Sequence, residues 1–529
     1  MTDHRNGGAA VVETLAANGV DTIFGIPGTH NLELYRHLRD AGIRPVTSRH
    51  EQGAGYAAEA YARVGGRPGV VVTTSGPGLT NAMTAAATAY AESQPMLVLS
   101  PGVPTGSEGR DLGLLHETKD SRAAMDHLVR WSRRVRSADE AADAVTDAFA
   151  SFRGTRPRPV HVEIPIDVLE QVWTGTARAA TTASAPAPDP VAAARAAAQL
   201  ARAQRPLIIA GGGAVDAATE VAALAEAIGA PVATSVNGKG VLDEGHPLSV
   251  GAAMRLRALQ DAAAASDALL VVGSELGDAD LWDGRIGGQA VIRVDVEAGQ
   301  LHKNCRADVT LLADAAEALW AVLTALPTDR PRATTGSARA AELRAACRAE
   351  ARHDAGPYEA VNAAVRAALP ADGVLTGDSS QVTYFGSVHF FDVPAPRRFC
   401  YTPGYATLGY GLPAGIGASL ARPGSPVATL LGDGAFMFSV QELATAVELR
   451  LPLPIVVVDN GGYREIRDQE HSRGIAPVGV DLHVPDLALL ATAFGAHGTR
   501  TTDTAAIGEL VHDALGADRP TVIHLDWTE

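Results

Sequence analysis

Short, predominantly apolar runs recur along this chain, and the stretches between them have the composition of helices. Such runs occupy residues 69–74, 96–100, 206–210, 268–272, 290–294, 427–431 and 454–458. A strand that is apolar at every position is buried on both faces, which is typical of parallel sheets covered by helices on both sides. The pattern therefore predicts an α/β protein built from doubly wound parallel sheets.

Two segments rich in Ala, Pro, Thr and Ser, residues 177–190 and 327–339, interrupt this pattern and are predicted to be linkers. Each part of the chain has its own alternation of strands and helices, so we expect three doubly wound domains. In the second of them a helix is expected from Asp216, after a glycine turn that lacks the spacing of a dinucleotide-binding loop. The predicted domains are residues 1–176, 191–326 and 340–529.

The charge balance and the cysteines limit the class of protein. With 44 basic and 60 acidic residues the net charge is −16, which disfavours a nucleic-acid binder that needs a basic face. We find no apolar run long enough to cross a membrane and no apolar signal core at the N-terminus, so no membrane partner is expected. Cys305, Cys347 and Cys400 are too scattered for a disulfide framework or a zinc site. A reduced, cytoplasmic setting is expected.

The most informative segment is LLGDGAFMFSVQELATAVELRLPLPIVVVDNGGY. One strand ends before the Gly-Asp-Gly turn at 432–434, a helix with a predicted Ser439/Glu442 capping box follows, and a second strand leads to Asn460. Neighbouring parallel strands place their carboxyl ends together, so Asp433 and Asn460 are expected to meet there. Their oxygens, with a carbonyl of the second glycine turn, suit Mg²⁺ bound to phosphate.

This arrangement, Gly-Asp-Gly with an Asn 27 residues after the Asp, resembles the signature of thiamine-diphosphate enzymes. The resemblance implies that Mg²⁺ is held by Asp433, by Asn460 and by the carbonyl of Gly462. It also implies that the residues of the first turn contact the cofactor diphosphate; these are Gly432, Asp433, Gly434 and Ala435. One departure is Asp459, because the family usually has Asn at that position.

A second motif lies in the first domain, where RHEQGAGYAAEAYAR is followed by TTSGPGLTNAM. The pair resembles the pyrimidine-binding domain of acetolactate synthases and related 2-oxo acid decarboxylases. The resemblance implies that Glu51 activates thiamine diphosphate. A carboxyl group that is hydrogen-bonded to the pyrimidine nitrogen promotes loss of the thiazolium C2 proton. Pro77, Gly78 and Asn81 are expected in the loop that follows, with Pro77 at the cofactor and Gly78 serving the turn.

The segment YATLGYG, residues 405–411, aligns with the family's cofactor-bending stretch. By that resemblance Leu408 is the side chain wedged between the two cofactor rings, and the carbonyl of Ala406 binds the aminopyrimidine. Bending brings the amino group to the reacting carbon, which is a proximity effect. After another strand, Ser380 and Gln381 either touch phosphate or substrate or simply cap a turn.

Three loci are expected to decide what happens to the substrate. Thr29 and His30 lie in a loop that resembles the substrate-facing loop of decarboxylases, although a solvated His is an equal alternative. His116 and Glu117 occupy the place of the His-His-Thr of pyruvate decarboxylases, or else stabilise their loop. Glu465 comes one residue before the position of a catalytic Glu in pyruvate decarboxylases, or else faces solvent.

The overall pattern is closest to the 5-guanidino-2-oxopentanoate (2-oxoarginine) decarboxylases, in which Glu117 or Glu465 could face a cationic substrate tail. The expected reaction is non-oxidative decarboxylation of a 2-oxo acid to an aldehyde and CO₂. Alternatives are an acetolactate-synthase-like carboligase, a benzoylformate-type or other 2-oxo acid decarboxylase, and a non-catalytic homologue. The resemblance implies a homodimer as the minimal active unit and a homotetramer as the usual assembly. The segments GAAMRLRAL and GSELGDADLW match neither flavin-binding element of acetolactate synthases, so FAD is not expected.

Overall fold

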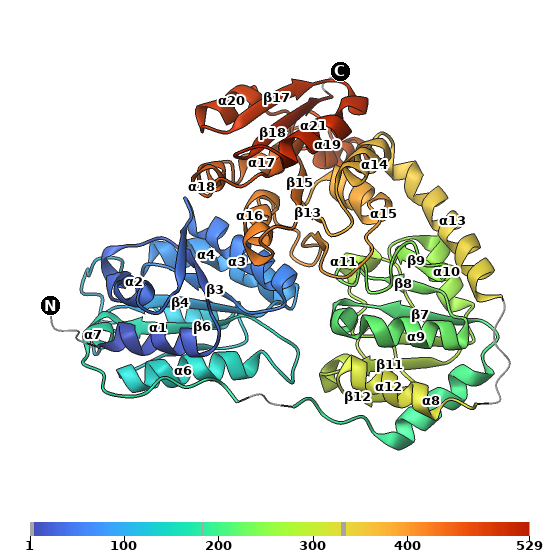
Figure 1. The fold of residues 1–529 in the computed structure, drawn as a ribbon, viewed down its shortest axis with the longest axis horizontal. Coiled ribbons are helices and arrows are strands. Elements are labelled where there is room, and N and C mark those ends of the chain that lie inside the picture. Colours follow the sequence, from blue (N-terminus) through green and yellow to red (C-terminus); the bar gives the residue numbers. More distant parts are fainter. Residues whose placement is uncertain (1–4, 182–183, 329–334, 528–529) are drawn as a thin grey trace.

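The computed structural model describes residues 5–181, 184–328 and 335–527. They form three parallel six-stranded sheets with helices on both faces, which confirms the predicted fold class (Figure 1). The first two domains lie beside each other and the third lies above both in this view. Among the described residues, no helix has the length and apolar character needed to cross a membrane.

The first sheet has the order β2-β1-β3-β4-β6-β5. Its strands are β1 (Thr22–Gly25), β2 (Arg44–Thr47), β3 (Gly69–Val72), β4 (Met96–Gly102), β5 (Ser132–Arg134) and β6 (Val160–Pro165). Its helices are α1 (Gly7–Ala17), η1 (Thr29–Asn31), α2 (Leu32–Leu38), α3 (Glu51–Gly65), α4 (Pro77–Ala91), α5 (Ser121–Asp126), α6 (Ala138–Ser151) and α7 (Ile166–Glu170).

The second sheet has the order β12-β11-β10-β7-β8-β9. Its strands are β7 (Pro206–Ala210), β8 (Val232–Thr234), β9 (Ser249–Ala252), β10 (Ala268–Val272), β11 (Val291–Asp295) and β12 (Val309–Leu312). Its helices are α8 (Pro190–Arg202), η2 (Gly212–Ala217), α9 (Ala218–Ile228), α10 (Arg257–Ala264), α11 (Asp278–Leu281), η3 (Ala298–Gln300) and α12 (Ala315–Ala325).

The third sheet has the order β14-β13-β15-β16-β18-β17. Its strands are β13 (Val374–Gly377), β14 (Phe399–Cys400), β15 (Val427–Gly432), β16 (Pro454–Asp459), β17 (His497–Thr501) and β18 (Thr521–Asp526). Its helices are α13 (Gly336–Ala355), α14 (Tyr358–Ala368), η4 (Val382–Ser387), α15 (Val388–Phe390), α16 (Gly411–Ala421), α17 (Asp433–Met437), α18 (Glu442–Glu448), α19 (Arg464–Ser472), α20 (Leu487–Ala493), η5 (Thr504–Ala506) and α21 (Ile507–Leu515).

Several local predictions were wrong. The helix expected from Asp216 begins two residues later, because a 3₁₀ turn occupies 212–217. The second linker is shorter than predicted: α13 already begins at Gly336, and residues 329–334 lie outside the described chain. In the first linker, residues 182–183 lie outside it as well, and Pro190 starts α8 with Asp189 as its cap.

The predicted capping box at Ser439 was also wrong. The hydroxyl of Ser439 is buried without a partner among the described residues, and α18 begins at Glu442 with no side-chain cap. The carboxylate of Glu442 instead accepts from the backbone of Arg49 and His50, more than 390 residues away in sequence. A tertiary contact therefore replaces the local one that the sequence suggested.

A buried polar network joins the three domains. Arg63 of α3 pairs with Glu59 on the same helix and also donates to Asn237 of the second domain. Asn237 donates to Glu92, which accepts from the backbone of Gly404 in the third domain at 2.7 Å. Buried charges persist only when paired and hydrogen-bonded. The network therefore fixes the segment around Gly404 against both other domains.

Candidate active site

The residues predicted to hold a metal lie at the carboxyl edge of the third sheet. Strands β15 and β16 are parallel neighbours, and Gly432 is registered with Val458. Asp433, 2% exposed, starts α17, and its carboxylate accepts from the amide of Gly462 at 2.9 Å. Burial, with the charge of Asp459 nearby, raises the pKa of Asp433 to about 6. A bound cation would offset the cost of this buried charge.

Asn460 and Gly462 complete a set of oxygen donors. The side-chain nitrogen of Asn460 donates to the hydroxyl of Tyr358 at 2.9 Å, which leaves its amide oxygen for another partner. Gly462 has φ of 99°, and a Cβ there would lie 2.5 Å from the carbonyl of Val480, so the turn requires glycine. Carboxylate, amide and carbonyl oxygens are the ligands that Mg²⁺ prefers. The residues present therefore fit a Mg²⁺–diphosphate group.

The residue that departs from the family pattern, Asp459, has a structural partner. Its carboxylate accepts from the amide of Gly461 at 3.1 Å and lies 3.0 Å from Nε2 of His524 on β18. Both side chains are buried. The pair fixes the turn after β16. Sequence reasoning missed His524, for which the only signal was a His within an otherwise apolar strand.

Ser380, Gln381 and Glu465 belong to the same edge. The hydroxyl of Ser380 accepts a hydrogen bond from the amide of Gly432 at 3.0 Å. Ser380 therefore caps the turn, and this amide already has a hydrogen-bond partner within the protein. Gln381 lies 3.4 Å from the side-chain nitrogen of Asn460 and donates to Glu465 at 3.1 Å. Tyr384 donates to the same carboxylate at 3.0 Å. Glu465 therefore faces the site rather than open solvent.

The segment predicted to bend the cofactor is held by Asp378, a residue to which the sequence assigned no role. Its buried carboxylate accepts from the amides of Gly409 and Gly411 at 3.2 and 2.7 Å, and burial raises its pKa to about 7. Ala406 has φ of 50°, a left-handed conformation that is costly for a residue with a Cβ. Leu408 is half-buried against the core. The loop thus presents Ala406 and Leu408 in one fixed shape.

Glu51 lies at the N-terminus of α3 and is only 8% exposed. Asn81 donates to its Oε2 at 2.9 Å. The expectation that Pro77, Gly78 and Asn81 form a loop was wrong, because Pro77 is the first residue of α4, a position that favours proline. Glycine at position 78 lets the helix backbone lie close to Glu51, because a Cβ there would lie 3.1 Å from Oε1 of Glu51. The face of the carboxylate beside Gly78 is thereby kept open.

Glu442, which sequence reasoning placed in a capping box, supports Glu51 instead. Its buried carboxylate binds the amides of Arg49 and His50, the two residues before Glu51.

Substitution of Glu442 by Ala would leave those amides unpaired, and we expect a loss of about 2–4 kcal/mol in unfolding free energy. Chemical denaturation would measure it. Glu448→Ala on the same helix removes an exposed carboxylate and should change stability by less than about 1 kcal/mol. Equal effects of the two variants would contradict this role.

The structure brings His30 and His116 together through a serine that the sequence analysis did not single out. Nδ1 of His30 lies 2.6 Å from the hydroxyl of Ser75, and Nδ1 of His116 lies 3.4 Å from it. The ring centroids are 5.3 Å apart. Burial and the neighbouring His116 lower the pKa of His30. Both rings keep Nε2 free of Ser75, so each can exchange a proton at that atom.

Thr29 and Glu117 do not join this pair. Thr29 is exposed in the short helix η1. The carboxylate of Glu117 accepts from the backbone of Leu112 and Leu114 within its own loop. These backbone bonds lower the pKa of Glu117. The loop-stabilising alternative is therefore better supported for Glu117 than a role at the substrate.

Comparison with known proteins gives three matching family models along the chain. They are the N-terminal thiamine pyrophosphate (TPP) binding domain at residues 5–125, the central domain of thiamine pyrophosphate enzymes at 193–322, and the C-terminal TPP binding domain at 378–525.

Curated relatives match nearly the whole chain. "Probable 2-ketoarginine decarboxylase AruI" of Pseudomonas aeruginosa is 41% identical over 98% of this chain and 93% of its own length. The "Acetolactate synthase isozyme 2 large subunit" of Escherichia coli is 33% identical over 99% of this chain and 96% of its own length. A "Probable acetolactate synthase large subunit" of Methanocaldococcus jannaschii is 30% identical, with 98% and 91% covered.

Proposed function

Because this chain belongs to the thiamine pyrophosphate enzyme family, we propose that it decarboxylates a 2-oxo acid and that this acid is 5-guanidino-2-oxopentanoate. The observation that carries the reaction class is the set of Asp433, Asn460 and Gly462 at one sheet edge, together with the buried Glu51 at another. The substrate is supported by the similarity to a 2-ketoarginine decarboxylase.

Thiamine diphosphate, when bound, supplies a carbon that adds to the 2-oxo group and takes up the electron pair as CO₂ leaves. Asp433, Asn460 and the carbonyl of Gly462 would hold the metal that accompanies the diphosphate. Glu51 holds a proton at the pyrimidine nitrogen, and Asn81 orients the carboxyl that does so. Leu408 and Ala406 keep the two rings in the reactive shape.

His30 and His116 are proposed to move the proton that completes the aldehyde. Each ring directs Nδ1 toward Ser75, so Nε2 is the atom available to donate. An imidazole positioned in this way can act as a general acid. Protonation here, rather than addition to a second 2-oxo acid, gives an aldehyde and CO₂.

We propose Mg²⁺ as the metal and a homodimer as the minimal active unit. Exposed apolar side chains flank both groups of site residues: Leu112 and Leu115 follow β4, and Met437 and Phe438 follow Asp433. A second copy of the chain would cover such surfaces. By the same family resemblance we propose a homotetramer, and by the three free cysteines a reducing, cytoplasmic setting.

We also propose that the second domain binds no FAD. The two segments that differ from the flavin-binding elements carry Arg255 and Trp282, and the Arg255 guanidinium lies 4.9 Å from the Trp282 ring centroid. These side chains pack against each other and against Phe385 of the third domain. Activity is therefore expected without added flavin.

A carboligase of the acetolactate synthase type is the second candidate, because relatives with that name match nearly the full chain. The test is product analysis over a panel of 2-oxo acids with thiamine diphosphate and Mg²⁺. The panel includes 5-guanidino-2-oxopentanoate, benzoylformate, branched-chain acids and pyruvate. We expect the fastest CO₂ release from the guanidino acid, with 4-guanidinobutanal as product. Acetolactate from pyruvate as the main product would favour the carboligase instead.

A further inference from the structure

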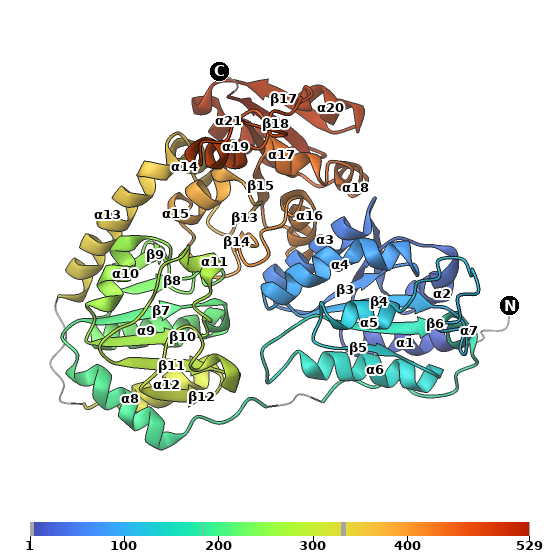
Figure 2. The ribbon, with the colours of Figure 1, turned by 180° about the vertical axis from the view of Figure 1, so that it is seen from behind.

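A small cavity, partly open to solvent, lies between the second and third domains. Its walls include Asp280 and Trp282, at and just after α11, and Tyr384, Tyr401 and Pro403 of the third domain. Figures 1 and 2 both show α11 at the end of the second domain that faces the third. We call this space the interdomain cavity.

The interdomain cavity adjoins the candidate active site. The hydroxyl of Tyr384 donates to Glu465, which is linked through Gln381 to Asn460. On another wall, Tyr401 and Pro403 precede Ala406 and Leu408 in the same loop. A substrate held at the cofactor could therefore extend its tail into this space.

Asp280 gives the cavity a carboxylate that lacks a cationic partner. Its Oδ1 accepts only the backbone amide of Val236, at 3.2 Å, and none of the ion pairs among the described residues includes it. Burial raises the pKa of Asp280 to about 6. A partly buried carboxylate of this kind is stabilised by a cation that pairs with it.

The other walls suit a flat cation. Trp282 has φ of 48°, a strained conformation for a bulky residue, and its ring lies 5.9 Å from Tyr384 and 5.8 Å from Phe385. The guanidinium of Arg255 already lies over this aromatic surface. Cations of this kind bind well to the faces of Trp and Tyr rings.

Arg255 itself does not neutralise Asp280. Its Nη1 donates to Asp354 at 2.8 Å, and its Nε donates to Nε2 of His389 at 2.9 Å. Burial and the charge of Arg255 lower the pKa of His389 to about 3, so this ring is neutral. Because Arg255 forms its ion pair with Asp354, it does not compensate the negative charge of Asp280.

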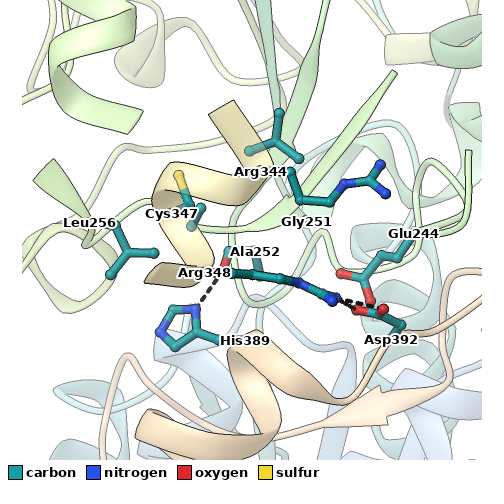
Figure 3. A pocket seen from close by; sticks show the side chains of 11 residues that line it. Glu244, Gly251, Ala252, Leu256, Arg344, Cys347, Arg348, His389 and Asp392 are labelled. Atoms are coloured by element: carbon teal, nitrogen blue, oxygen red, sulfur yellow. Dashed lines mark hydrogen bonds and ion pairs between the residues drawn. The ribbon is translucent and has the colours of Figure 1, made fainter. Parts of the chain in front are cut away.

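A second small cavity, which His389 also lines, differs from the first in its charges. Figure 3 shows its polar groups turned toward one another, with Arg348 paired to Asp392 and His389 bonded to the carbonyl of Ala252. The carboxylate of Glu244 is likewise paired, with Lys239. The acidic groups of that cavity already have cationic partners, whereas Asp280 has none among the residues that the structure describes.

We propose that Asp280 binds the guanidinium group of the substrate beside the rings of Trp282 and Tyr384. The assignment rests on the proposed function and makes Asp280 the residue that selects a cationic 2-oxo acid. The N–H groups of a guanidinium can donate two parallel hydrogen bonds to one carboxylate, which matches Asp280.

The test compares two substrates of the same shape. In 5-ureido-2-oxopentanoate an oxygen replaces one guanidinium nitrogen and the charge is lost. Asp280→Asn keeps an oxygen for the amide of Val236 but removes the negative charge. We expect it to raise KM for the guanidino acid at least about 10-fold and to change kcat/KM for the ureido acid less than about 3-fold. Retained ureido turnover shows that the variant is folded. Asp278→Asn, an exposed carboxylate on the same helix, is the matched control and should change neither.

A binding measurement separates this inference from the proposed function. Calorimetry on the cofactor-loaded enzyme would use 5-guanidinopentanoate, which lacks the 2-oxo group. If the wild type binds this compound and Asp280→Asn does not, the binding site is supported. That conclusion holds even if the enzyme releases no CO₂ from the guanidino acid. Absence of CO₂ release would refute only the proposed substrate. Equal binding by wild type and Asp280→Asn, or equal KM for the guanidino acid, would overturn the assignment of Asp280.

Discussion

Replacing Glu51 by Gln should lower kcat for decarboxylation by about 10²–10⁴-fold, the range typical for loss of a positioned acid–base group. The amide keeps the shape of the side chain but cannot hold the proton that the pyrimidine nitrogen requires. Because Asn81 and the Arg49 and His50 backbone fix this position, the variant should fold and still bind thiamine diphosphate. Stopped-flow detection of CO₂ with saturating cofactor measures the effect.

The control for Glu51→Gln is Glu448→Gln. Glu448 pairs with Arg49, close in sequence to Glu51, but its side chain is 61% exposed. This variant removes the same charge near the same helix end, and kcat should stay within about 2-fold of the wild type, because exposed ion pairs contribute little. Full turnover by Glu51→Gln would show that Glu51 does not activate the cofactor.

Replacing Asp433 by Asn is expected to weaken the apparent affinity for Mg²⁺ and thiamine diphosphate by more than about 100-fold. Loss of a residue that only supports a metal ligand costs about 10–100-fold, and Asp433 is proposed as a ligand itself. The amide oxygen can still accept from Gly462, so the turn should keep its shape. Activity titrated with Mg²⁺ at fixed cofactor, and tryptophan fluorescence titrated with cofactor, give the two affinities.

Asp372→Asn is the matched control for Asp433→Asn. Asp372 is exposed in the turn before β13, at the opposite end of the same sheet. It should leave both titrations unchanged. Wild-type affinities in Asp433→Asn would mean that the metal is held elsewhere.

The fold and the chief site residues could be predicted because they depend on local patterns. The apolar runs at 206–210 and 268–272 are β7 and β10 with unchanged bounds, since a doubly buried strand needs apolar residues throughout. Asp433 and Asn460 meet because their strands are parallel neighbours joined by a helical crossover. Chain order and strand pairing alone determine that meeting.

The supporting residues could not be predicted because they act across long sequence separations. Glu442 has the local spacing of a capping box with Ser439, yet its carboxylate binds the backbone of Arg49 and His50. Asp378 holds the amides of Gly409 and Gly411, and Asp459 meets His524 from another strand. For such contacts the packing of whole domains decides which of several possible partners a carboxylate takes.

Of the residues that the sequence predicts to face the substrate, the structure brings only some together. His30 and His116 come from separate loops and meet because both follow strands of the first sheet, at its carboxyl edge. Glu117, adjacent to His116, turns back on its own loop, which its sequence position does not reveal. Asp280 was overlooked because acidic residues in a short helix carry no motif.

Decarboxylation at the site proposed around Glu51 and Asp433 is expected to depend on the cofactor. The most direct measurement is CO₂ release from 5-guanidino-2-oxopentanoate by protein stripped with a chelator and then resupplied with thiamine diphosphate, Mg²⁺, or both. We expect turnover only with both, and one 4-guanidinobutanal per CO₂. Failure to release CO₂ from this acid or any other 2-oxo acid, with cofactor and metal both present, would contradict the account.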